Sequence, residues 1–328
     1  MNRRMLAAGL AALTTAWLVP MPSQAQAQST WPDRPVRLVL PFAAGGAADV
    51  VIRIVGAAVA ERVGQNMVVE NRTGGSGNIG TEVVARAGPD GYTFLVGSPG
   101  TLAINPHMFQ RLPYDVRRDF IAVSHVASFP QVLVVHPGVP AKTIEEFIAL
   151  AKREPGKLNY GSSGNASTGH LITEMFRSQA GIQLEHVPFR GGGPAAQALV
   201  AGTVQMVIDG LPTWLSYMGG DQIRILGVTS GQRWPGLPDV PAIGEKAVPG
   251  FDLGSWVVLA APTGTPQAVL ERFASEIDVA LKRDDVRQRL AQAGALPAGG
   301  TPAEAQAFHM RELEKWKRVV EVSGATIN

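Results

Sequence analysis

The sequence predicts an α/β protein with mainly parallel sheets. Short runs rich in Val, Ile and Leu, each the length of a strand, alternate with stretches of helical periodicity. The alternation continues from residue 36 almost to the end of the chain. Strands that alternate with helices imply βαβ units, and such units build parallel sheets.

The expected elements follow one another regularly along the chain. We expect strands at residues 36–41, 67–71, 94–97, 131–136, 158–162, 186–189, 206–209, 223–229 and 256–260. We expect helices at residues 48–63, 79–87, 144–153, 169–179, 193–201, 266–282, 285–293 and 302–322. Pro266 suits the first position of its helix. The last helix carries an apolar stripe, which predicts core packing, at Phe308, Leu313, Trp316 and Val320.

The first 27 residues have the features of an export signal. Arg3 and Arg4 precede an apolar stretch at residues 5–19, and Ala25-Gln26-Ala27 suits a cleavage site. We therefore expect cleavage after about Ala27 and a periplasmic protein. Paired arginines occur in both general and twin-arginine signals, so the export route stays open. The apolar stretch is shorter than the roughly 20 residues of a membrane span.

The amino-acid composition excludes several kinds of site and argues against some classes of partner. The chain has no cysteine, which excludes disulfides, thiolate metal sites, a cysteine nucleophile and the lipid anchor of a lipoprotein. Of the 29 basic residues, 27 remain without Arg3 and Arg4, and they face 27 acidic residues. This balance argues against nucleic acid or an anionic membrane as a partner. About 301 of the 328 residues remain after cleavage, enough for one large or two ordinary domains.

Glycines and hydroxyl residues gather where predicted strands end and helices begin. In parallel sheets, ligands bind beyond the carboxyl ends of the strands. Helix N-termini there present unpaired N–H groups that suit an anion. Any single junction is also explained as a tight turn that needs glycine. Together they predict a cleft lined by backbone N–H groups, at residues 41–49, 73–80, 98–101, 161–168 and 190–194.

Three charged residues at the ends of predicted strands or in the loops that follow them are candidates for a role in binding. Asp49 suits the first turn of a helix, where it interacts with the helix dipole, or it accepts a hydrogen bond from a ligand. Asp209 ends a strand, and a structural role is favoured for it. Arg190, beside three glycines, either pairs with a ligand carboxylate or is a solvated loop residue.

Two other sites are disfavoured by spacing. Gly75-Ser-Gly-Asn-Ile-Gly80 matches a dinucleotide fingerprint, but it does not directly follow a strand. The next strand also lacks a terminal acid. The six histidines show no spacing typical of metal ligands. We therefore expect no cofactor and no metal site.

A serine hydrolase remains an alternative. Ser162 and Ser163 lie seven or eight residues before His170, although the segment is not the G-x-S-x-G elbow of hydrolases. A catalytic triad is defined by geometry, which spacing alone does not exclude. Hydroxyl groups at a helix start more often cap the helix or bind an anion.

Motifs along the whole mature chain carry a family likeness. The chain resembles the Bug-type (TctC-like) solute-binding proteins of tripartite tricarboxylate transporters. The motifs are WPDRPV at 31–36, VLPF at 39–42, GG-x-x-D at 45–49, GQ at 64–65, VVENR at 68–72, GNIG at 77–80, PDGY at 89–92, YGSSGN at 160–165, HVPFRGGGP at 186–194, LPDVP at 237–241 and APTGTP at 261–266.

The resemblance implies a type II-like periplasmic binding fold. Two α/β domains would be joined by two crossover strands, with the solute between them and no catalysis. Residues 28–127 and 254–328 would form one domain, and residues 128–253 the other. The partners implied are a small carboxylate (an organic acid or amino acid) and the membrane subunits of the transporter. A monomer is expected, and a sensory role that docks on a receptor domain is the alternative.

Carried over to this chain, the family's binding loops predict the ligand-binding residues. They are Phe42, Ala43, Gly46, Ala47, Asp49, Ser98, Ser162, Ser163, Asn165, Thr168, Gly192, Gly193 and Asp209. This chain has Ala48 where the family commonly has threonine, and Ala166 where it often has glycine. Loss of a hydroxyl at Ala48 would remove one ligand or water contact. The resemblance therefore predicts the carboxylate class and no specific acid.

Overall fold

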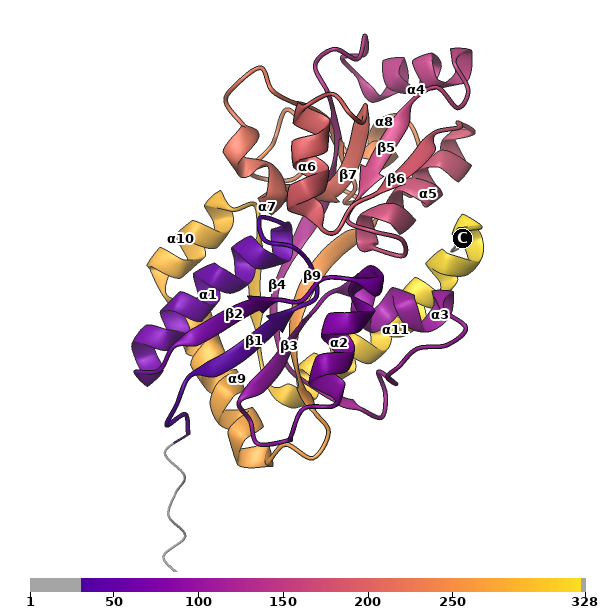
Figure 1. Ribbon diagram of the computed structural model, residues 1–328. Coiled ribbons are helices and arrows are strands. Elements are labelled where there is room, and N and C mark those ends of the chain that lie inside the picture. Colours follow the sequence, from indigo (N-terminus) through magenta and orange to yellow (C-terminus); the bar gives the residue numbers. More distant parts are fainter. Residues whose placement is uncertain (1–30, 326–328) are drawn as a thin grey trace, which may run out of the picture. The chain divides into compact units, whose positions relative to one another are not determined.

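A computed structural model describes residues 31–325 of the chain. The export signal expected at residues 1–27 lies outside the described residues. The strands are β1 (Val36–Leu40), β2 (Met67–Asn71), β3 (Thr93–Gly97), β4 (Phe120–Val135), β5 (Asn159–Ser162), β6 (Glu185–Pro188), β7 (Met206–Gly210), β8 (Arg224–Val228), β9 (Gly254–Pro262) and β10 (Leu296–Gly299). Figure 1 shows their arrangement.

The α-helices are α1 (Ala47–Val63), α2 (Asn78–Ala85), α3 (Asn105–Met108), α4 (Ile144–Arg153), α5 (Thr168–Ala180), α6 (Gly192–Val200), α7 (Leu211–Trp214), α8 (Ile243–Lys246), α9 (Gln267–Lys282), α10 (Asp284–Gln292) and α11 (Pro302–Ser323). Short turns of other helix types are η1 (Gly75–Gly77), η2 (Gly100–Ile104) and η3 (Leu215–Tyr217). Local sequence sets several helix starts. At α11, Thr301 and Glu304 form a capping box, and at α4 the Thr143 side chain accepts the Glu146 N–H.

The strands form two groups that share β4. In the first group the order is β2-β1-β3-β9-β4, with β10 on β4, and in the second it is β4-β7-β5-β6, with β8 on β4. β4 pairs with β9 along residues 120–130 and with β7 and β8 along residues 131–135. One long strand therefore passes from the first group into the second (Figure 1).

The α/β class is confirmed, and the sheet is mixed. β1 pairs in parallel with β2 and β3, and β5 pairs in parallel with β6 and β7. The pairs that involve β4 or β9 are antiparallel. The strand expected at 131–136 is the second half of β4. Its first half was missed because polar residues interrupt the apolar pattern, among them Ser124, His125 and Ser128. The domain boundaries expected at 127/128 and 253/254 stay a prediction.

Apolar side chains connect the two strand groups. One buried cluster contains Val39 and Leu95 of the first group together with Leu133 and Tyr160 of the second. A second cluster, which includes Trp214, lies within the second group. The core thus continues along β4 from one strand group to the other. This shared core brings the loops at the strand ends of the two groups together.

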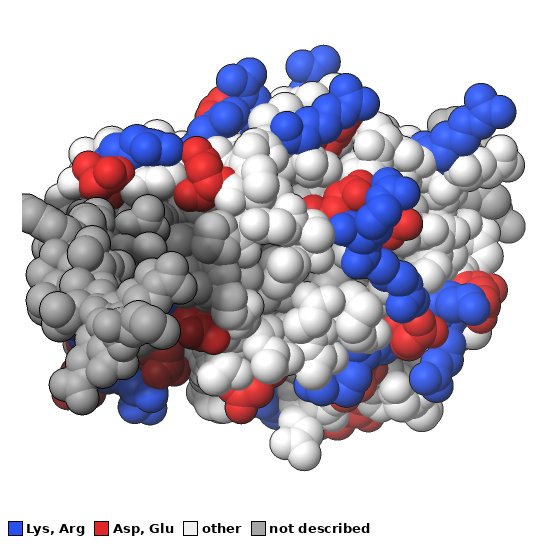
Figure 2. All heavy atoms as spheres, turned by 90° about the horizontal axis from the view of Figure 1, so that it is seen from below, with Lys and Arg blue, Asp and Glu red and all other residues white. Residues whose placement is uncertain are grey.

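Charged side chains of both signs mix on the surface. Figure 2 shows one face, where basic and acidic groups lie interspersed. Several ion pairs join α1 to α9 and its C-terminal end, including Arg62–Glu276 and Arg283–Glu61. This face offers no broad basic patch to a polyanion. Separately, none of the helices in residues 31–325 combines the length and apolarity that a membrane crossing requires.

Candidate functional site

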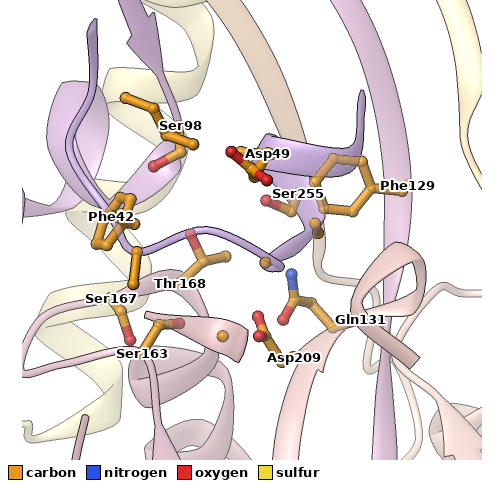
Figure 3. A pocket seen from close by; sticks show the side chains of 16 residues that line it. Phe42, Asp49, Ser98, Phe129, Gln131, Ser163, Ser167, Thr168, Asp209 and Ser255 are labelled. Carbon is orange, nitrogen blue, oxygen red and sulfur yellow. The ribbon is translucent and has the colours of Figure 1, made fainter. Parts of the chain in front are cut away.

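A cavity of about 50 Å³ lies where loops of the two strand groups meet. Figure 3 shows the side chains around it. The first group contributes the β1–α1 loop, the end of β3 and the start of β9. The second contributes the β5–α5 loop, the α6 N-terminus and the end of β7. The lining residues are Leu40, Phe42, Ala43, Gly46, Ala47, Ala48, Asp49, Ser98, Phe129, Gln131, Ser163, Ser167, Thr168, Gly192, Asp209 and Ser255.

The N-terminus of α1 faces this cavity. Gly45, at a φ of 83°, turns the chain from β1 toward the helix, a conformation that favours glycine. Gly46 precedes the helix and provides no side-chain cap. The first N–H groups of a helix have no partner within it and carry a partial positive charge. This end of the cavity therefore suits a negatively charged group.

Asp49, in the first turn of α1, is held by hydrogen bonds to the β1–α1 loop, to α1 and to β2. It accepts hydrogen bonds from the Gly45 N–H at 3.1 Å, Arg53 Nε at 2.9 Å and Asn71 Nδ2 at 3.2 Å. Burial alone would raise the pKa of Asp49, but the hydrogen bonds from Arg53, Gly45 and Asn71 together keep it below its usual value. Asp49 is therefore ionised and already well supplied with donors.

A second helix N-terminus comes from α5. Ser167 precedes the helix, and its hydroxyl accepts the His170 N–H at 3.3 Å. Ser163, Ser167 and Thr168 line the cavity with hydroxyl groups (Figure 3). Ala166 lies in the left-handed region at a φ of 56°, which is uncommon for a residue other than glycine.

The third helix N-terminus, that of α6, touches the β1–α1 loop through backbone. The Ala43 N–H donates to the Arg190 carbonyl at 3.0 Å. A Cβ on Gly192 would lie 3.3 Å from the Gly46 Cα, and one on Gly193 would lie 2.4 Å from the Ala44 carbonyl oxygen. The glycines at 192 and 193 thus permit a backbone contact between the two groups that side chains would prevent.

Asp209 and Gln131 lie beside two of these helix N-termini. A Cβ on Gly192 of α6 would clash with the Asp209 carboxylate, and a Cβ on Gly169 of α5 would lie 3.7 Å from Gln131 Oε1. Asp209, at the end of β7, is 8% exposed, and its hydrogen-bond donors among the described residues are neutral: the Gly210 N–H at 2.9 Å and the Thr213 hydroxyl at 3.3 Å. Burial raises the pKa of Asp209 to about 6. Gln131 of β4 is 2% exposed, and its Oε1 has no hydrogen-bond partner within the described residues.

No lysine or arginine is among the described residues that line the cavity. Arg53 reaches Asp49 from behind the loop, with half of its side chain exposed. Arg190 lies instead in a wider hollow of about 480 Å³, together with Asn165 and the η1 glycines. That hollow shares Phe42 and Ser163 with the cavity. Positive potential inside the cavity comes from helix N-termini.

The structure brings most of the sequence-predicted site residues to the cavity. Ser162, Asn165 and Gly193 do not line it. Ser162 is fully buried beside His186, Asn165 lines the neighbouring hollow, and Gly193 contacts Ala44. The residues that do line it are Phe42, Ala43, Gly46, Ala47, Asp49, Ser98, Ser163, Thr168, Gly192 and Asp209. Their part in ligand binding stays a prediction.

Four lining residues lie outside the predicted binding loops, namely Leu40, Phe129, Gln131 and Ser255, while Ala48 and Ser167 lie inside those loops but were not predicted to bind the ligand. Gln131 and Phe129 lie on β4, which crosses from one strand group to the other, and Ser255 lies on β9 beside it. Loops that follow strands were expected to line the cleft, and crossing strands were not. A lone glutamine at the head of the apolar run at 132–135 is the signal that could have identified Gln131.

The serine–histidine pair of the hydrolase alternative is not formed. The His170 Nδ1 accepts the Ala166 N–H at 3.1 Å, and Ser163 instead lines the cavity. A different pair meets, because Ser162 Oγ and His186 Nε2 lie 2.6 Å apart. Burial lowers the pKa of His186 to about 3. Among the described residues, no group of three His, Cys, Asp or Glu side chains could hold a metal ion.

Comparisons with known proteins point to one family. Residues 51–325 match the sequence profile of the tripartite tricarboxylate transporter family receptor. The protein BugT of Bordetella pertussis is 33% identical over 91% of this chain and 92% of its own length.

Solved structures of related proteins are similar to this chain over most of its length. R. palustris Rpa4515 with adipate has a TM-score of 0.88 and 37% identity, over 90% of this chain and 99% of that one. MatC from Rhodopseudomonas palustris with bound malate has a TM-score of 0.84 and 32% identity, over 88% and 100%.

Proposed function

Because this chain belongs to the tripartite tricarboxylate transporter receptor family, whose members are periplasmic binding proteins, we propose that it captures a small carboxylate and delivers it to membrane transporter subunits. The carboxylate would occupy the cavity between the β1–α1 loop and the loops of the second strand group. The protein would act as a monomer and without catalysis.

One observation carries this proposal, namely that three helix N-termini border a cavity whose described lining has no lysine or arginine. α1 and α6 begin without a side-chain cap, and hydroxyl groups surround the start of α5. Backbone N–H groups and aligned peptide dipoles stabilise an anion without a buried cation. Malate and adipate in the related structures are carboxylates of suitable charge.

Capture would couple to closure of the two strand groups. In the proposed division, residues 28–127 with 254–328 form one domain and residues 128–253 the other. β4 and β9 cross between them near Pro130 and Gly254, which pair with each other. Two crossing strands form a suitable hinge. A ligand that contacts both domains favours the closed state, and this difference in affinity drives closure.

The location follows from the same family assignment. We propose that the segment ending near Ala27 directs export and is removed, and that no lipid anchors the mature chain, since the sequence has no cysteine. The route of export is not part of the proposal.

A thermal-shift screen tests the proposal. The purified protein is unfolded and refolded to remove carried-over solute. It is then tested with mono-, di- and tricarboxylates, amino acids and uncharged sugars. At 100 times its dissociation constant, a bound ligand adds about 2.7 kcal/mol to the free energy of unfolding. We expect stabilisation by at least one carboxylate and none by sugars; the reverse pattern would overturn the proposal.

A further inference from the structure

The cavity lining offers hydrogen-bond donors and acceptors close together. Near Gly46 and Thr168 the cavity meets helix N-termini, which offer donors. The Asp209 carboxylate and the Gln131 side chain line the same cavity (Figure 3), beside the N-termini of α6 and α5. A ligand whose carboxylate meets the helix N–H groups therefore has these two acceptors nearby.

Asp209 and Gln131 have more hydrogen-bond acceptor positions than the described residues fill. A carboxylate has about four acceptor positions, and Asp209 receives only the Gly210 N–H and the Thr213 hydroxyl. The second of these bonds is long, at 3.3 Å. Gln131 Oε1 receives none from residues 31–325. Asp209 supplies acceptors whichever way the Gln131 amide is turned.

These acceptors are buried, so bulk water does not readily satisfy them. Gln131 is 2% exposed and Asp209 is 8% exposed. A buried acceptor without a donor destabilises the folded state, and a ligand donor relieves this. No cation among the lining residues neutralises Asp209, in contrast to Asp49, which pairs with Arg53.

We propose that Asp209 and Gln131 select solutes that carry a hydroxyl or amino group near the carboxylate. The preferred ligand would thus be a small hydroxy acid or amino acid, and a plain alkyl carboxylate would bind more weakly. This rests on the proposed function, because the carboxylate anchored at the helix N-termini sets the ligand's position.

Matched ligands test the proposal by isothermal titration of the refolded protein. Propionate, lactate and alanine share a three-carbon skeleton and differ by a hydrogen, a hydroxyl and an ammonium group. Succinate and malate form a second pair. We expect at least about tenfold tighter binding of the donor-bearing member in one series, since a site built for a hydrogen bond discriminates against analogues that lack the donor. The lactate and alanine arms distinguish a hydroxyl from an ammonium group.

Variants test whether Asp209 and Gln131 cause the preference for donor-bearing ligands. Asp209→Asn and Gln131→Met should reduce that preference to below about threefold, because each removes an acceptor for the ligand's donor group. Exposed Asp221→Asn and Gln232→Met are matched controls and should retain the preference. Circular dichroism and unfolding curves establish that each variant is folded.

The outcomes separate this inference from the proposed function. Equal affinity for plain and donor-bearing ligands, or equal loss of both in the Asp209 and Gln131 variants, overturns the inference and leaves carboxylate capture intact. If no carboxylate of any kind binds, the proposed function itself fails.

Discussion

Two aspartates face the same cavity from opposite strand groups, and their surroundings differ in kind. Asp49 accepts hydrogen bonds from a backbone N–H, an amide and a guanidinium, which keep its pKa below the usual value despite burial. Asp209 accepts two hydrogen bonds from neutral donors, and burial raises its pKa to about 6. Asp49 uses its acceptors to shape its own loop, whereas Asp209 retains acceptors for a ligand.

The difference separates two tasks of a binding cavity. One side must hold a glycine loop in a conformation that aims helix N–H groups at an anion, and an ionised, fully bonded aspartate does this well. The other side must distinguish solutes, which requires groups whose hydrogen bonds are incomplete until the ligand arrives. Such incompleteness lowers the stability of the ligand-free protein.

The largest expected effect comes from removing Asp49. In Asp49→Ala, the Gly45 N–H and the Asn71 amide lose a buried acceptor and Arg53 loses its ion-pair partner. We expect the free energy of unfolding in urea to fall by about 3 kcal/mol. Exposed Asp221→Ala is the control and should change it by less than about 0.5 kcal/mol. A loss at Asp49 as small as in this control would show that Asp49 does not stabilise the β1–α1 loop, and so would contradict its structural role.

A glycine at the contact between the groups gives the next effect. The Cβ of Gly193→Ala would lie 2.4 Å from the Ala44 carbonyl, so the α6 N-terminus could no longer approach the β1–α1 loop. We expect about 30-fold weaker carboxylate binding by calorimetry, equivalent to about 2 kcal/mol.

Stability in the absence of ligand should fall by less than this, because the preference of alanine over glycine for a helix offsets part of the loss of the same backbone contact. Gly88→Ala is a suitable control, since an added Cβ there meets no atom within 4 Å. Unchanged affinity in Gly193→Ala would mean that ligand binding does not need this contact.

Asp209→Asn should produce a smaller, pH-dependent effect. Because burial raises the pKa of Asp209 in the folded state to about 6, from an ordinary value of 3.8, the folded protein binds the proton more tightly than the unfolded chain. The charged carboxylate therefore lowers stability above about pH 6, and this penalty disappears as the pH falls toward 4.

We expect Asp209→Asn to raise the free energy of unfolding relative to wild type by about 1–2 kcal/mol more at pH 7.5 than at pH 4.5. Urea unfolding at the two pH values measures it, with Asp221→Asn as the control. A difference between variant and wild type that is independent of pH would show that burial does not raise the pKa of Asp209.

The sequence predicted the class of fold and most of the cavity lining, because strand and helix patterns and glycine junctions are local features. The roles of the two aspartates were only partly local. A structural role was favoured for Asp209 and two roles stayed open for Asp49. Helical spacing alone makes Arg53 a candidate partner of Asp49, four residues away on the predicted helix, whereas Asn71 on β2 cannot be assigned as a partner without the fold. Gln131 was missed because its position depends on β4 passing between the strand groups.

Arg53→Gln is expected to have the smallest effect, and it asks whether the cation or the loop distinguishes Asp49 from Asp209. Half of the Arg53 side chain is exposed, so solvent and salt screen its charge, and we expect unfolding in urea to become easier by only about 0.5 kcal/mol at pH 7. The loss should shrink in high salt, and also when the pH falls below the lowered pKa of Asp49, because protonation of Asp49 then removes the ion pair in wild type. If Arg53→Gln were as damaging as Asp49→Ala, the two aspartates would differ mainly by one neighbouring cation. A small loss would instead assign the difference to the Gly45 N–H and the Asn71 side-chain amide.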